Sequence, residues 1–261
     1  MIHKYDETVL YIFLFTLMAL FLYSCATSPK VEKSITSRNP RIILQVACLD
    51  LTNLSKRIEQ KHIIELVKTL KREQVEVFAV QGISRYPGVA TRLDFVNELS
   101  AQTDWRNAYG EMLNISGRQT GNAVFSSYPI ISYQNITFEK IIPKSFESAL
   151  QTIIDVGVYP LAIISTQLPT KMTTEEQSQC IKLISKLSPD TTNPLTIIAG
   201  NLPSSETIRK AFLFTDIFSP KPAKTMMPKM WCSTNVSFQL LSSRTVETEM
   251  GTIGIAQFAL Y

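Results

Sequence analysis

Side chains suited to acid–base catalysis are scarce in this chain. Its 261 residues include two histidines, His3 near the N-terminus and His62 in a predicted helix. A histidine next to Gln60 and Lys61 is typical of the surface or boundary of a helix, so we do not expect His62 to act as a catalyst. A mechanism that needs two imidazoles, one to activate water and one to stabilise charge, lacks its groups here.

Three further side chains have a chemistry that depends on their surroundings. Cys48 lies in an apolar run, where burial raises the pKa of a thiol, so we expect a small buried side chain rather than a nucleophile. Asp50 follows two residues later and either offers a carboxylate at the rim of a cleft or caps a turn. Arg118, in the segment SGRQT, either meets an anionic ligand through its planar guanidinium group or stays solvated.

The first 24 residues have the composition of a secretory signal. Lys4 precedes an apolar run over residues 10–23, which is shorter than the ~20 residues of a membrane-spanning helix. The run leads into LYSC (22–25), which is similar to a bacterial lipobox, so we expect Cys25 to be lipidated. The alternative is an uncleaved N-terminal anchor helix with an incidental cysteine. Both alternatives tether the chain to a membrane, and the first places it in a bacterial cell envelope.

A polar segment separates this anchor from the globular part. Residues 25–40 begin with the lipidated cysteine and continue with two prolines and no apolar period, which is typical of a flexible tether. Residues 41–261 have the length of one large domain. Three cysteines remain in this domain, Cys48, Cys180 and Cys232, and the odd number allows at most one disulfide bond among them.

The charge distribution does not indicate a nucleic-acid partner. The formal net charge is +4, and the basic residues are dispersed rather than gathered in one block. We therefore expect no nucleic acid, contact with a membrane through Cys25, and a protein of the envelope as partner.

The apolar periodicity predicts the elements that position these residues. The predicted strands cover residues 42–49, 75–80, 122–126, 132–138, 150–156, 161–168, 195–199, 236–241 and 254–260. The predicted helices cover residues 54–71, 91–101 and 205–214, and a further helix begins at Thr173 with a Thr-x-x-Glu capping box. The order strand, helix, strand at the start indicates an α/β fold.

Four segments, taken in order, resemble those of the endonuclease/exonuclease/phosphatase family. They are EVFAVQG (76–82), GNAVFSSYPI (121–130), STQL (165–168) and IAGNLP (198–203). The resemblance spans roughly residues 41–261. It implies an α/β fold that is a four-layer sandwich of two packed mixed β-sheets flanked by helices.

The positions that carry metal-dependent catalysis in that family hold other residues in this chain. The resemblance places Cys48 where an asparagine helps to hold metal and phosphate, and Gly82 where a glutamate binds the metal. Gln167 replaces a histidine, and Asn201 replaces an aspartate. Ser237 replaces the aspartate that orients the general base. Mg²⁺ relies on carboxylate oxygens, so the resemblance implies that the principal metal ligand is lost.

The final strand lacks the expected general base as well. The segment Thr252–Gly254 falls where the family has Ser-Asp-His, and it contains neither acid nor base. We therefore predict no catalytic residue, no metal site and no cofactor.

The same resemblance brings several polar residues to the former catalytic cleft. They are Asn122, Gln167, Asn201 and Ser237, with Asp50 and Arg118 nearby. They form either a neutral pocket for a sugar or another uncharged polar ligand, or a group whose members bond to one another. We therefore expect a membrane-tethered, non-catalytic binding or scaffolding module. The alternative is a strongly diverged phosphodiesterase or phosphatase that recruits Mg²⁺ or Mn²⁺ through other carboxylates, for example Asp50 or Asp155.

Overall fold

The structure is a computed structural model that describes residues 39–54, 56–87, 89, 92–169, 171–187, 195–201, 214–218, 229–233 and 238–261. One compact unit covers Asn39–Tyr261. The predicted signal peptide, Cys25 with its predicted lipidation and most of the predicted tether lie outside the described residues. The same holds for residues 205–213 of the helix predicted at 205–214, whose last residue, Phe214, begins a strand instead. None of the helices described is long and apolar enough to cross a membrane.

Twelve strands and three helices are described in the compact unit. The strands are β1 (Ile42–Asp50), β2 (Val77–Arg85), β3 (Arg106–Ile115), β4 (Arg118–Ser126), β5 (Ile130–Thr137), β6 (Ser148–Asp155), β7 (Pro160–Gln167), β8 (Thr196–Asn201), β9 (Phe214–Asp216), β10 (Met230–Ser233), β11 (Phe238–Thr248) and β12 (Gly251–Leu260). The helices are α2 (Gln60–Arg72), α3 (Phe95–Thr103) and α4 (Thr174–Ser185).

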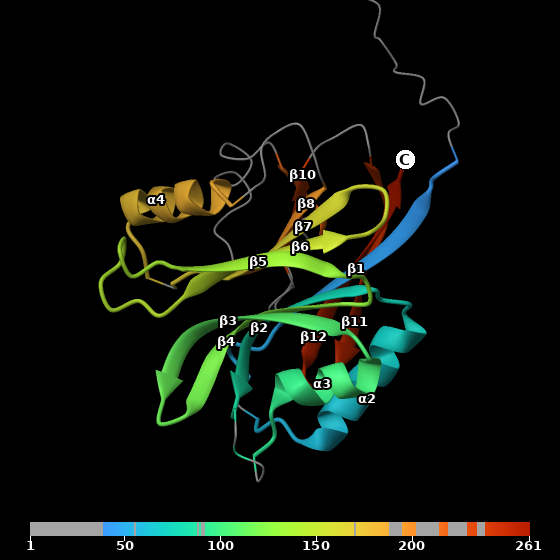
Figure 1. The fold of residues 1–261 in the computed structure, drawn as a ribbon. Coiled ribbons are helices and arrows are strands. Elements are labelled where there is room, and N and C mark those ends of the chain that lie inside the picture. Colours follow the sequence, from blue (N-terminus) through green and yellow to red (C-terminus); the bar gives the residue numbers. More distant parts are fainter. Residues whose placement is uncertain are drawn as a thin grey trace, which may run out of the picture. The chain divides into compact units, whose positions relative to one another are not determined.

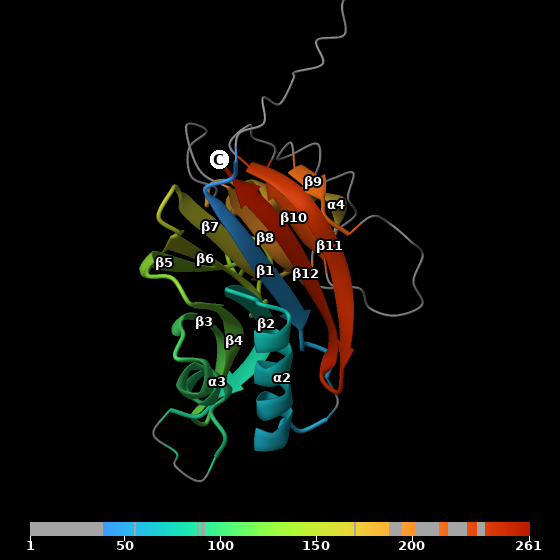
Figure 2. The same ribbon diagram turned by 90° about the vertical axis from the view of Figure 1, so that its right-hand side faces the viewer.

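The strands form two six-stranded sheets that pack face to face (Figures 1 and 2). The first sheet has the order β11-β12-β1-β2-β4-β3, and the second has the order β5-β6-β7-β8-β10-β9. Each sheet is mixed, since β1 pairs with β2 and β7 pairs with β8 in parallel while the other described pairs are antiparallel. The predicted α/β fold of two packed mixed sheets flanked by helices is confirmed.

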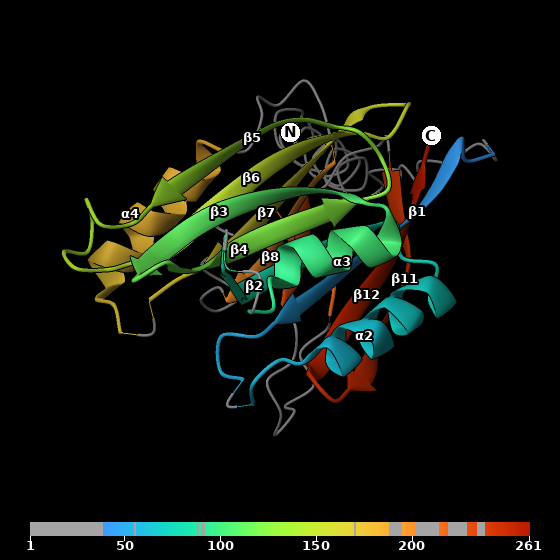
Figure 3. The same cartoon turned by 60° about the horizontal axis from the view of Figure 1, so that its bottom comes forward.

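Helices cover the outer faces of both sheets and complete four layers (Figures 1 and 3). Helices α2 and α3 pack on the first sheet, and α4 packs on the second. The apolar stripe of α2 consists of four buried residues at helical spacing: Ile63, Leu66, Val67 and Leu70. The predicted capping box of α4 is present, because Thr173 Oγ1 accepts from the Glu176 backbone N–H at 3.2 Å and Glu176 accepts from the Thr173 N–H at 2.8 Å.

Two helices begin later than the apolar pattern predicts. The helix predicted at 91–101 is observed as α3, which starts at Phe95 with Asp94 as its N-cap. The predicted helix at 54–71 is observed as α2, which starts at Gln60. The N-cap is Glu59, whose backbone N–H donates to Nδ1 of His62 at 2.9 Å. His62 therefore closes the first turn of a helix. Its side chain is only 10% exposed, so it lies at the boundary of the helix rather than on its open surface.

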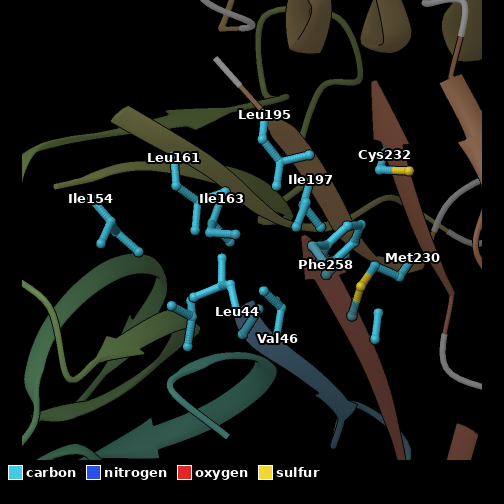
Figure 4. Close-up of a cluster of buried hydrophobic side chains, with 14 of the residues drawn as sticks. Leu44, Val46, Ile154, Leu161, Ile163, Leu195, Ile197, Met230, Cys232 and Phe258 are labelled. Carbon is cyan, nitrogen blue, oxygen red and sulfur yellow. The ribbon is translucent and has the colours of Figure 1, made fainter. Parts of the chain in front are cut away.

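The core between the sheets is apolar along most of its length (Figure 4). Leu44 and Val46 of β1 face Ile163 of β7 and Ile197 of β8 there, with Phe258 of β12 beside them. Side chains at every second position of a strand point into this layer. The same alternation, continued past the apolar residues, brings polar side chains into the layer where β1, β2, β7 and β8 end.

Candidate functional site

Four polar side chains lie buried between the sheets at the end of the apolar core. We call them the inter-sheet polar cluster: Gln81 of β2, Asn122 of β4, Ser148 of β6 and Ser165 of β7. Each is at most 1% exposed. Burial of polar groups is costly unless they form hydrogen bonds, so the bonds of this cluster decide its stability and its chemistry.

Gln81 joins the two sheets. Its Nε2 donates to Oγ of Ser165 at 2.7 Å and to the carbonyl of Ala199 at 3.4 Å. The Ser165 hydroxyl in turn donates back across the interface to the carbonyl of Val80 at 3.3 Å. The amide of Gln81 is thus held between β7 and β8 although its backbone belongs to the first sheet.

Asn122 forms a second link on the neighbouring strand of the first sheet. Its Nδ2 donates to the carbonyl and Oγ of Ser148 at 3.1 and 3.4 Å, and to the carbonyl of Ser165 at 3.5 Å. Thr166 Oγ1 donates to the same Ser148 carbonyl at 3.2 Å. Both amides therefore meet at Ser165, and their N–H groups are engaged.

The acceptor oxygens of these amides are not engaged. Gln81 Oε1 and Asn122 Oδ1 are buried and have no hydrogen-bond partner among the residues that the structure describes. The same is true of Oε1 of Gln167, which lies two residues beyond Ser165 on the same face of β7. The site is thus rich in unused acceptors and contains no charged side chain of its own.

Gly82 closes the space next to Gln81. Its φ is +71°, a backbone conformation that favours glycine. A Cβ built on Gly82 would lie 2.7 Å from the backbone N and Cα of Thr52, because residues 51–52 fold back over this point. The Leu51 N–H donates to the Gln81 carbonyl at 3.0 Å and holds that segment in place. The position where the resemblance expects a metal-binding glutamate has no room for a side chain.

Asp50 lies beside this closed point but bonds within its own turn. In the parallel register of β1 and β2, Asp50 is the partner of Gln81. Its Oδ1 accepts from the backbone N–H of Thr52 at 2.9 Å and from the Thr52 hydroxyl at 2.6 Å. The carboxylate therefore stabilises the turn that covers Gly82, which is the turn role that the sequence left open.

The remaining predicted site residues lie in different surroundings. Arg118 is exposed, and its Nε and Nη2 donate to Ser84 Oγ at 3.3 and 3.2 Å. Asn201 is the register partner of Gln167, but its side chain lies outside the described part of the structure. Ser237 lies outside the described residues. Asp155 ends β6 at the turn to Pro160, seven residues from Ser148, which is roughly 24 Å along a strand at ~3.4 Å per residue.

Cys48 is a buried neighbour of the site rather than a nucleophile. It is 1% exposed and pairs in register with Gly254 of β12. Burial raises the pKa of its thiol to about 12, so the thiol stays protonated at neutral pH. Cys48, Cys180 and Cys232 are all free and buried.

Sequence reasoning missed half of the cluster. Ser148 and Ser165 were not singled out, and Gln81 entered only as a member of the EVFAVQG segment. A signal was present, since Gln81 and Ser165 are polar residues at inward-facing positions of otherwise apolar strands. Their pairing across 84 residues of chain becomes visible only when the two sheets are packed.

Comparisons with solved structures show where this fold occurs. An endonuclease/exonuclease/phosphatase from Beutenbergia cavernae matches with a TM-score of 0.65 at 13% identity, covering 84% of this chain and 72% of that one. The corresponding protein of Bacteroides vulgatus has a TM-score of 0.65 at 10% identity, covering 85% and 100%. The catalytic domain of human Nocturnin with bound sulfate has a TM-score of 0.63 at 12% identity, covering 86% and 100%. No protein-family model and no curated protein matches the sequence. The chain thus has the endonuclease/exonuclease/phosphatase fold.

The residues at the site do not fit a divalent metal centre. Within the part of the chain that the structure describes, no three or more His, Cys, Asp or Glu side chains are grouped to hold a metal ion. The inter-sheet polar cluster offers neutral amides and hydroxyls, whereas Mg²⁺ is anchored by carboxylates. Asp50 supplies one carboxylate nearby, and its Oδ1 is occupied by Thr52.

Proposed function

We propose that this protein is a membrane-tethered, non-catalytic binding or scaffolding module built on the endonuclease/exonuclease/phosphatase fold. The observation that carries the proposal is the closure of the site at Gly82, where the Thr52 backbone lies at the place of a side chain. A fold does not dictate a function, so the proposal depends on this site and not on the resemblance to enzymes.

Metal-assisted phosphoester hydrolysis needs a cation to neutralise developing charge and a base to activate water. Gly82 leaves no anchor for the cation. On the last strand, Gly254 lies beside the protonated Cys48 and offers no base. His62 is committed to the first turn of α2, where its Nε2 lies 3.5 Å from Glu249. These features favour a domain that keeps the fold but lacks the metal ligand and the general base needed for hydrolysis.

The tether is a separate part of the proposal and has its own test. We infer lipidation at Cys25 from the lipobox-like segment, and with it a place in a bacterial cell envelope. Replacing Cys25→Ser is expected to give unacylated protein that leaves the membrane fraction. Retention of the variant in membranes, or unchanged acylation, would assign the anchor to another segment.

A titration with Mn²⁺ tests the loss of catalysis without a guess about the substrate. We expect calorimetry of the full chain in detergent to show no saturable binding, and bis(p-nitrophenyl) phosphate to remain unhydrolysed with Mn²⁺ or Mg²⁺ present. One-site binding that disappears in Asp50→Ala but persists in the matched Asp155→Ala, together with hydrolysis, would replace the proposal by a diverged phosphodiesterase. Asp155 is a suitable control because it lies at the far end of β6.

A non-catalytic module of this kind acts by binding, and we propose a protein of the envelope as its partner. Cross-linking in intact cells followed by purification through the anchored chain is then expected to recover one envelope protein at a fixed ratio. Recovery that depends on the folded domain, and not on the tether alone, would identify the domain as the binding module.

A further inference from the structure

The unused acceptors of the inter-sheet polar cluster call for a ligand. Three amide oxygens, from Gln81, Asn122 and Gln167, are buried without a partner among the described residues. Two of these amides are fixed in the interior, since Gln81 and Asn122 are at most 1% exposed and both bond to Ser165 through their nitrogen atoms. Buried acceptors of this kind are normally satisfied by a donor or a cation.

We infer that the cluster is a binding site for one monovalent cation, coordinated by Gln81 Oε1, Asn122 Oδ1 and Gln167 Oε1. Amide and carbonyl oxygens can replace the hydration shell of such an ion. A single water molecule donates only two hydrogen bonds and would leave one of the three oxygens unpaired. Further waters would bring lone pairs that need donors, and the Nε2, Nδ2 and Ser165 hydroxyl donors are already in use.

The charges around the cluster favour a monovalent ion over a divalent one. The three ligating groups are neutral, and a buried ion without a counter-charge is costly. Asp50, the register partner of Gln81, is the acid that the strands place next to the cluster. One carboxylate balances one monovalent ion, whereas a divalent ion in this neutral set would keep an uncompensated charge.

The closed geometry limits the size of the ligand. Gln81 and Asn122 are sealed from solvent. A Cβ built on Gly82 or on Gly200 would collide with backbone atoms of a neighbouring segment. A Cβ on Gly200 would lie 1.8 Å from the Thr166 carbonyl, so β7 and β8 are in close contact here. The occupant inferred is therefore a small ion, and Na⁺, K⁺ and NH₄⁺ are the monovalent ions to compare.

Thermal unfolding in different chloride salts tests the inference. The full chain in detergent is heated at one ionic strength while Na⁺, K⁺ or NH₄⁺ replaces tetramethylammonium, which is too large to enter. We expect one of the small ions to raise the Tm with a saturable concentration dependence, because an ion that binds only the folded state stabilises it by mass action. The three ions are compared separately, so the series also identifies the preferred one.

Two variants separate binding from a general salt effect. Gln167→Ala removes one ligand from a partly exposed position and is expected to abolish the ion-specific rise in Tm. Gln179→Ala, on the exposed face of α4, is the matched control and is expected to keep it. Equal Tm values in all four salts, or a rise that survives in Gln167→Ala, would overturn the inference.

A direct measurement supports the thermal series. Tl⁺ is a heavy substitute for K⁺, and its anomalous scattering from a soaked crystal is expected at the three amide oxygens. The inference builds on the proposed loss of the divalent centre, but the two fail differently. Saturable Mn²⁺ binding would refute the proposed function, whereas indifference to Na⁺, K⁺ and NH₄⁺ would refute only the cation site.

Discussion

Adding one methyl group to Gly82 tests whether this site is truly closed. Gly82→Ala must hold a side chain at φ +71° and also place its Cβ 2.7 Å from the Thr52 backbone. The left-handed conformation costs about 1–2 kcal/mol for a residue other than glycine. Displacing a packed backbone costs about 1–3 kcal/mol more. We therefore expect Gly82→Ala to lower the free energy of unfolding by about 2–5 kcal/mol.

Gly117 provides a matched control on the same molecule. Its φ is +81°, close to that of Gly82, but a Cβ built there meets nothing within 4 Å. Gly117→Ala therefore carries the conformational cost alone, about 1–2 kcal/mol. The effect of alanine on the unfolded chain is similar at both positions and cancels in the comparison.

Urea denaturation followed by circular dichroism measures both free energies of unfolding. The difference between the two variants isolates the collision with Thr52 and is expected to be about 1–3 kcal/mol. If Gly82→Ala costs no more than Gly117→Ala, residues 51–52 move aside easily. The reasoning would then fail, because the same movement would make room for a metal-binding side chain.

Three further predictions concern the surroundings of the site and the helix that covers the second sheet. Asn122→Ala removes the donor to Ser148 and Ser165 and is expected to lower the free energy of unfolding by about 1–3 kcal/mol, measured in urea; an unchanged midpoint would show that the link carries no stability. Burial raises the pKa of the Cys48 thiol to about 12, so this thiol is expected to resist alkylation at pH 8 until the protein unfolds. Peptide mass spectrometry follows the label, and rapid labelling of the native chain would contradict the burial. Thr173→Ala breaks the capping box of α4 and is expected to cost about 1 kcal/mol at neutral pH. Part of this cost depends on pH, because hydrogen bonds from the backbone and hydroxyl of Thr173 lower the pKa of Glu176. The bond from the hydroxyl to the carboxylate contributes above the usual carboxyl pKa and is lost as pH falls through the lowered value, whereas the bond from the Glu176 N–H to Oγ1 stays. A cost that stays constant down to pH 2 would argue against the carboxylate.

Local sequence patterns were sufficient where a segment carries its own signal. The apolar run of β1 and the capping box of α4 depend on neighbouring residues only, and both are observed as predicted. The stripe of α2 was also read correctly, but the helix begins at Gln60 rather than near Leu54, because its end is defined by the bonds between Glu59 and His62.

The candidate site was only half visible for the opposite reason. Asn122 and Gln167 could be named from their segments, but their surroundings depend on strands that are distant in sequence. Arg118 bonds to Ser84 in this structure, and Asp155 lies at the far end of β6. Neither arrangement can be read from the spacing of residues along the chain.

The sequence by itself determined the alternation of strands and helices, the four segments that resemble one fold, and the absence of a second histidine from the globular part. These follow from composition and from periods of a few residues. Only the tertiary structure decided that the Thr52 backbone fills the space beside Gly82, and that Gln81, Asn122 and Gln167 are left with buried, unpaired oxygens. The physical reason is that closure and hydrogen-bond satisfaction are properties of two packed sheets, and their groups meet across 84 residues of chain in the case of Gln81 and Ser165.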